Sequence, residues 1–128
     1  GSGTPSPVLG EVIWGISNRG GLVFAAAGNV PGTAPVFPAA DPFTVAVTAL
    51  DGSGQAAWYA NTGNFVDLAA PGSAIVQHGG QTYLVSGTSS ATAWTSGYAA
   101  ATASQSSAAP RTILGQLLSR LGFGTKKP

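Results

Sequence analysis

The sequence of 128 residues has no cysteine and no methionine, and only 7% of its residues are charged. Without cysteine it can form neither a disulfide bond nor a thiolate metal site, and cysteine content does not indicate the cellular compartment of the protein. Globular proteins usually carry about 25% charged residues. The net charge of +1 comes without a basic stripe, which argues against a nucleic-acid-binding protein. No apolar run approaches the about 20 residues of a membrane-spanning helix.

What the chain does contain is small and apolar: 44% of its residues are hydrophobic and 19 are glycine. At this length it is one domain or a piece of one. Such a composition indicates either close packing of small residues or a missing partner surface. We interpret residues 1–128 as a single partial domain, with residues 1–3 a candidate cloning scar and residues 124–128 a flexible tail.

The pattern of apolar and turn residues predicts an α/β fold. A helix is expected after Pro5-Ser6-Pro7, ending at Gly20-Gly21, and a second, buried helix over 88–104, rich in small residues. A terminal helix is expected over 110–121, with proline at its start and glycine after its end. Expected strands cover residues 22–27, 43–50 and 65–69, followed by a hairpin of 75–78 and 82–85. This order is half of a doubly wound parallel sheet, with an added hairpin.

Two short segments carry the chemistry. Gly87-Thr88-Ser89 opens the small-residue helix, and Ala27-Gly28-Asn29 ends the first strand. A serine at a helix N-terminus lies among unpaired N–H groups that favour negative charge, and the asparagine amide would be a partner for an oxyanion. A serine nucleophile also needs a base and an orienting carboxylate.

Several other side chains favour structural interpretations. His78, the single histidine, is expected at a hairpin tip and not as the base. Asp51 begins Asp51-Gly52-Ser53, which is typical of a turn. The three tryptophans are expected to anchor the core or an interface; they are Trp14, Trp58 and Trp94.

Four segments in order resemble the C-terminal half of the catalytic domain of the subtilisin-like serine proteases, the subtilases. Besides the two above, they are Phe37-Pro38-Ala39 with the strand after it, and the run from Phe65 through Ala-Pro-Gly at 70–72. The resemblance covers nearly the whole chain. It implies that Ser89 is the nucleophile of peptide hydrolysis, and that Asn29 donates its amide to the oxyanion. It also implies substrate-binding roles for Ala26, Ala27, Gly28 and Thr88.

The family's catalytic Asp and His precede the serine and belong to an N-terminal half that this sequence lacks. The sequence also has Ser90 where the family usually has Met, and Ala93 where it has Pro. The chain alone is therefore predicted to be inactive unless another polypeptide supplies the two residues. The alternative is a non-catalytic subtilase-derived module, a pseudoprotease kept for binding or assembly.

The resemblance implies no cofactor beyond a weak structural calcium or sodium ion, near Ala39, Asp41, Thr44 and Asp67. The expected partner is the missing N-terminal half, or a second copy paired through the exposed edge of the strand at 22–27. The resemblance also implies a peptide or protein substrate once the site is complemented, and a secreted or cell-envelope location.

Overall fold

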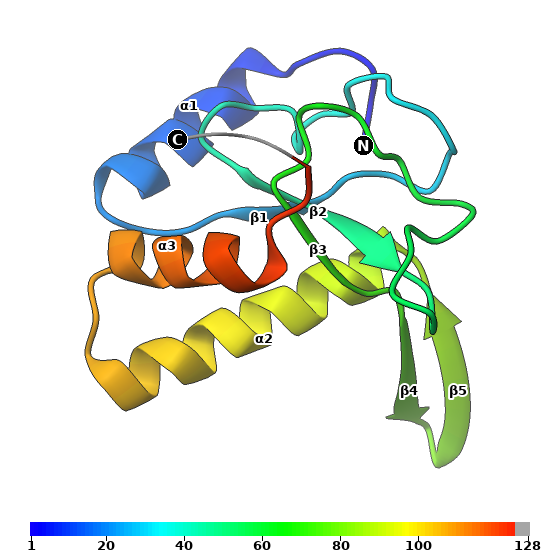
Figure 1. The fold of residues 1–128 in the computed structure, drawn as a ribbon. Helices are drawn as coiled ribbons and strands as arrows, with labels where there is room; N and C mark the ends of the chain where they lie inside the picture. Colours follow the sequence, from blue (N-terminus) through cyan, green and yellow to red (C-terminus); the bar gives the residue numbers. More distant parts are fainter. Residues whose placement is uncertain (125–128) are drawn as a thin grey trace.

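The computed structural model describes residues 1–124 and confirms the expected α/β fold (Figure 1). Its helices and strands follow in the order α1 (Pro7–Asn18), β1 (Phe24–Ala26), β2 (Val45–Leu50), β3 (Leu68–Pro71), β4 (Ser73–His78), β5 (Gln81–Ser86), α2 (Thr88–Ser106) and α3 (Pro110–Leu121). Strands β1, β2 and β3 form one sheet, and β4 pairs with β5 in a separate hairpin.

The sheet is parallel throughout, in the order β1-β2-β3. Phe24 pairs with Val45, and Val47 pairs with Leu68. In the central strand β2 every residue but the last is buried. A parallel strand covered on both faces needs such a continuous apolar run, because neither face meets water.

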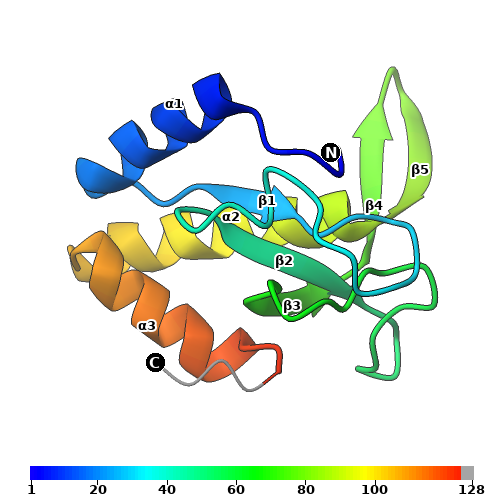
Figure 2. The ribbon, with the colours of Figure 1, turned by 90° about the horizontal axis from the view of Figure 1, so that it is seen from above.

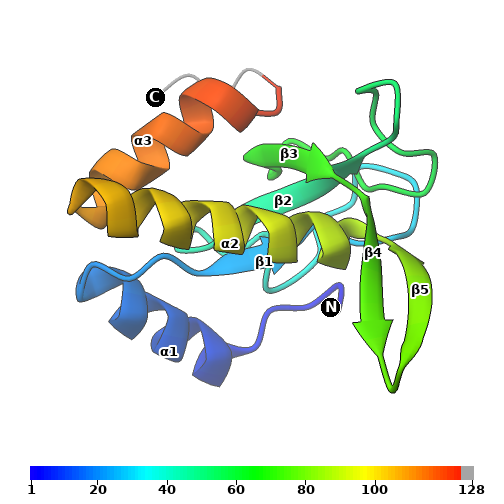
Figure 3. The same ribbon diagram turned by 90° about the horizontal axis from the view of Figure 1, so that it is seen from below.

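Helices cover the two faces unequally. Helix α2 packs across all three strands and α3 packs beside it, whereas α1 lies on the opposite side, displaced past the β1 edge (Figures 2 and 3). Because side chains alternate along a strand, Val45, Val47 and Ala49 join the core under α2 and α3. Ala46 joins a second cluster on the other face, with Phe65 and Val66.

The hairpin and the third strand differ in how well the sequence located them. The hairpin turns at Gly79-Gly80 as expected, with Ile75 opposite Leu84. Both of these side chains are about three-quarters exposed, at 74% and 75%. The third strand begins three residues later than expected: Phe65 and Val66 are buried, but Val66 N–H donates to Gly63 O in a turn.

The small-residue helix expected over 88–104 is present as α2, and it contributes one buried side to the core. Only one side of α2 is buried, by Thr88, Ala91, Thr95 and Ala99, because no element within residues 1–124 covers its other side. The tryptophans likewise lie outside the core, with exposed fractions of 52% for Trp14, 85% for Trp58 and 44% for Trp94. None of the helices found between residues 1 and 124 is long and apolar enough to cross a membrane.

Candidate active site

The site begins where β1 leaves the sheet. Ala27 still donates its N–H to Val47 O, at 2.9 Å. At Gly28 the backbone turns away with a φ of 107°, a conformation that favours glycine. The Gly28 carbonyl then accepts a hydrogen bond from Asn61 N–H at 3.0 Å, which fixes the direction in which Asn29 leaves the strand.

The second half of the site is the start of α2. Gly87 has a φ of 155° and donates its N–H to Gly72 O at 2.8 Å. A Cβ atom at this position would lie 3.0 Å from Nδ2 of Asn29, so a glycine here lets the asparagine side chain approach the helix start. The N–H groups of Ser90 and Ala91 then close on the Gly87 carbonyl and begin the helix.

A hydrogen-bond network joins the two halves. Oδ1 of Asn29 accepts from both the N–H and the hydroxyl of Thr88, each at 2.8 Å. The Thr88 hydroxyl in turn accepts from Gly28 N–H at 3.1 Å. These bonds occupy Oδ1 of Asn29, while its Nδ2 makes no hydrogen bond with any residue from 1 to 124.

Ser89 lies beside this network on the first turn of α2, and it is exposed. The N–H groups of its two neighbours already have acceptors: Thr88 N–H donates to Asn29 Oδ1, and Ser90 N–H donates to Gly87 O. The Ser89 N–H has no partner in the described part of the chain, as expected of an N–H in the first turn of a helix. Two free donors, from Asn29 and Ser89, thus lie at the positive end of the α2 dipole.

His78 lies far from these donors. It pairs with Gln81 at the tip of the hairpin, whereas Ser73 and Ser86 pair at its base, next to Gly87. Six residues of extended strand place the tip about 16 Å from the base. The structure therefore brings Ser89 together with Asn29 but not with His78.

The remaining predicted site residues differ in exposure. Ala26 and Gly28 are half-buried, whereas Ala27 and Thr88 are buried in the described chain. Their contact with a substrate stays a prediction.

Of the residues named for a weak cation, Ala39 and Asp41 place their backbone carbonyl oxygens around the Thr44 hydroxyl. It lies 2.9 Å from Ala39 O and 2.8 Å from Asp41 O. Oδ2 of Asp67 accepts from Ala46 N–H at 2.9 Å. Within residues 1–124 no group of three or more His, Asp or Glu side chains could hold a metal ion.

A cavity that sequence reasoning missed lies directly beside Asn29. It measures about 500 Å³, and its lining includes Asp51, Trp58, Tyr59, Ser73 and Ser86. Hydrogen bonds from Ser53, first through its side chain and then its backbone, and from Gln55 lower the pKa of the Asp51 carboxyl. No local pattern predicts this cavity, because its walls come from five separate segments of the chain.

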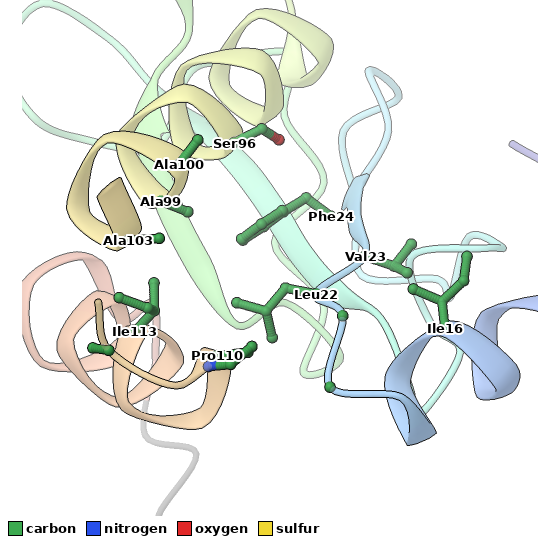
Figure 4. Close-up of a pocket in the computed structure, with 13 residues that line it drawn as sticks. Ile16, Leu22, Val23, Phe24, Ser96, Ala99, Ala100, Ala103, Pro110 and Ile113 are labelled. Atoms are coloured by element: carbon green, nitrogen blue, oxygen red, sulfur yellow. The ribbon is translucent and has the colours of Figure 1, made fainter. Parts of the chain in front are cut away.

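A second, larger groove of about 570 Å³ runs along the outer edge of β1, and it is apolar. Figure 4 shows Leu22 and Phe24 facing Ala99, Ala103 and Ile113 across it. Within the described residues β1 pairs only with β2, so the backbone of its outer edge has no strand beside it.

Comparison with known proteins agrees with this geometry. Residues 2–120 match the sequence model of the Subtilase family. The chain is 42% identical to thermitase of Thermoactinomyces vulgaris over 90 residues, which cover 69% of this chain and 32% of thermitase. It is 40% identical over 90 residues to a thermophilic serine proteinase of Bacillus sp. strain AK1, covering 69% of this chain and 22% of that protein.

Solved structures give the same result. The prenylagaramide maturation protease PagA superposes with a TM-score of 0.82 and 28% identity, over 92% of this chain and 46% of the PagA chain. The self-cleaved protease domain of PatA superposes with a TM-score of 0.81 and 30% identity, over 91% of this chain and 48% of the PatA chain. This chain thus spans less than half of either structure and about a third or less of the curated relatives. By its sequence and its fold, the chain belongs to the subtilase family.

Proposed function

We propose that this chain supplies the nucleophile and the oxyanion-binding groups of a serine endopeptidase. The Ser89 hydroxyl attacks the scissile carbonyl carbon and gives up its proton to a base. The negative oxygen that forms accepts hydrogen bonds from Asn29 Nδ2 and the Ser89 N–H. The amine product leaves with the proton, and water then hydrolyses the ester on Ser89. Substrate contacts are assigned to Ala26, Ala27, Gly28 and Thr88.

The observation that carries this proposal is the fixed orientation of the Asn29 amide. Thr88 holds Oδ1 through two donors, so Nδ2 is the side that is left to donate. A donor that is held in place before the reaction needs no reorganisation when charge develops on the substrate oxygen.

The base and its carboxylate partner come from outside residues 1–124 in this proposal, since His78 lies at the hairpin tip. We assign the apolar groove at β1 to the polypeptide that corresponds to the rest of the relatives' catalytic domain. The length of a related structure supports this assignment, because more than half of the PagA chain lies outside the part that superposes on this chain. A strand that joins the outer edge of β1 would pair its backbone groups and cover Leu22 and Phe24.

Labelling with a fluorophosphonate tests the catalytic proposal. The chain alone should stay unlabelled, because a serine hydroxyl without its base is a poor nucleophile. Mixed with the N-terminal portion of thermitase, it should be labelled at Ser89. Ser89→Ala should abolish labelling, and the neighbouring Ser90→Ala should retain it. Labelling of the isolated chain, or labelling that survives Ser89→Ala, would contradict the proposal.

In the complemented protein, Asn29→Ala should lower kcat by about a hundredfold to a thousandfold, the range known for the corresponding loss in a subtilisin. Asn64→Ala, at an exposed asparagine outside the site, is the matched control. Equal effects of the two substitutions would contradict the oxyanion role.

Light scattering over a concentration series tests the groove. Ala103 lines the groove and is exposed, so Ala103→Glu should block docking of the complement without unfolding the chain. Ala101→Glu, on the same helix but outside the groove, should dock normally. If the chain alone forms a dimer and Ala103→Glu converts that dimer to monomers, the occupant of the groove is instead a second copy of the chain.

The alternative proposal is a pseudoprotease module that binds or assembles. Two features are compatible with such a module: the exposed groove could bind a partner, and His78 lies far from Ser89. The module is favoured over an active protease if no added polypeptide restores fluorophosphonate labelling. Docking without labelling of Ser89 is the result that would support it.

A further inference from the structure

The cavity beside Asn29 has a chemistry that peptide hydrolysis alone does not explain. Of the four carboxylates in the sequence, only Asp51 lines it. Its volume of about 500 Å³ lies within the range of ligand pockets, about 300–1,000 Å³. Its lining brings Asn29 and Ser86, which are close to the reacting serine, together with Asp51 and Trp58.

The Asp51 carboxylate is held in place by a tight loop. Oδ1 accepts from Ser53 N–H at 2.8 Å, from the Ser53 hydroxyl at 2.7 Å and from Gln55 N–H at 3.1 Å. The Asp51 backbone adds a bond from its N–H to Gln55 O at 2.8 Å. Oδ2 has no hydrogen-bond partner and no cationic neighbour among residues 1–124, so one carboxylate oxygen remains available to a ligand.

An aromatic pair lines the same cavity as this carboxylate. The Trp58 ring is 85% exposed and meets Tyr59 edge to face, with centroids 5.7 Å apart. The Tyr59 hydroxyl donates to Gly72 O at 3.2 Å, which ties this pair to the base of the hairpin. An exposed indole and a carboxylate that line one cavity can attract a cation through the ring and through the charge together.

We propose that this cavity binds the cationic side chain of a lysine or arginine in the peptide substrate, with Asp51 and Trp58 as its substrate-binding residues. The inference rests on the proposed function, because the peptide must lie across Asn29 and Ser89 to reach the cavity. Because the cavity is lined by both Asn29 and Asp51, a long side chain with a terminal charge can reach the carboxylate from the reacting centre. Its stem covers the apolar lining, which includes Leu50 and Ala57.

An NMR titration of the isotopically labelled 128-residue chain tests this proposal without any catalysis. The probes are acetyl-Ala-Arg-Ala-amide and the same peptide with citrulline, which has the shape of arginine but no charge. We expect the arginine peptide to shift the Trp58 indole N–H and the Gly52 amide, and to bind about fivefold more tightly than the citrulline peptide. The Trp94 indole should not respond.

Asp51→Asn is the decisive variant, because an asparagine oxygen can still accept the bonds from Ser53 and Gln55 that hold the loop. It should reduce the preference for arginine to about one. Asp41→Asn is the matched control, since Asp41 also accepts a backbone N–H two residues on and lies outside the cavity. Trp58→Ala should weaken arginine binding about threefold.

Equal affinities for the two peptides, shifts confined to other residues, or a preference that survives Asp51→Asn would overturn the inference. Absence of saturable shifts up to about 10 mM peptide would overturn it as well. Labelling of Ser89 without an arginine preference would refute this inference alone. An arginine preference without labelling in the complemented protein would refute the proposed function and leave the cavity's ligand established.

Discussion

Thr88→Val is the sharpest test of the network that holds Asn29. Valine keeps the branched shape of a side chain that is only 1% exposed, but it removes two hydrogen bonds. One runs from the Thr88 hydroxyl to Asn29 Oδ1, and the other from Gly28 N–H to that hydroxyl. A typical hydrogen bond contributes about 1 kcal/mol net, and a buried group left without a partner costs about 1–3 kcal/mol. Because Gly28 is half-buried, water restores part of its bonding, and we expect a loss of about 2 kcal/mol.

Equilibrium denaturation of the 128-residue chain in urea measures this loss, with the same m value required for wild type and variant. Thr95→Val is the matched control on the same helix. Thr95 is also fully buried, but its hydroxyl donates only to the helical carbonyl of Ala91 at 2.9 Å. Its replacement should cost less than about 1 kcal/mol. Equal losses for the two substitutions would refute the reasoning, because the hydroxyl at 88 would then have no special role.

Three further results are expected. Gly87→Ala should lower the free energy of unfolding by about 1–3 kcal/mol, because Gly87 has a φ of 155° and lies next to the Asn29 amide. Gly97→Ala, at a position in open space on α2, should instead raise it by about 0.5–1 kcal/mol. Urea denaturation measures both changes. Leu117→Ala should cost about 2–5 kcal/mol in the same assay and Leu118→Ala much less, since their exposed fractions are 1% and 43%. In the complemented protein, His78→Ala should leave kcat/KM unchanged, and a loss of activity would show that the hairpin tip reaches Ser89.

The sequence predicted best where local rules decide the structure. Proline at the first helical position located the start of α3 at Pro110, and Gly122 followed its end, as expected. The hairpin followed from two glycines, both of which adopt positive φ. Apolar runs were less reliable: Phe65 is buried without joining a strand, because burial alone does not require pairing.

Tertiary features were beyond reach of the sequence. Small residues along α2 permit close packing on every side of the helix, but they do not determine which sides have a neighbouring element. In the described structure only one side of α2 is buried. The proximity of Asn29 to the helix start that carries Ser89 was expected through family resemblance, not through spacing. The cavity at Asp51 and Trp58 required the fold, since its turn residues and its aromatic residues each have ordinary local explanations.

The bond between Asn29 and Thr88 also orders events during synthesis of the chain. Its partners lie 59 positions apart, and the bond can form only after the sheet has brought β1 to α2. Closing so long a loop comes late relative to local helices and hairpins. A nascent chain that has emerged only as far as the hairpin therefore has no oriented amide beside a serine. The folding reaction itself therefore delays the orientation of the Asn29 amide at the start of α2 until the sheet has formed.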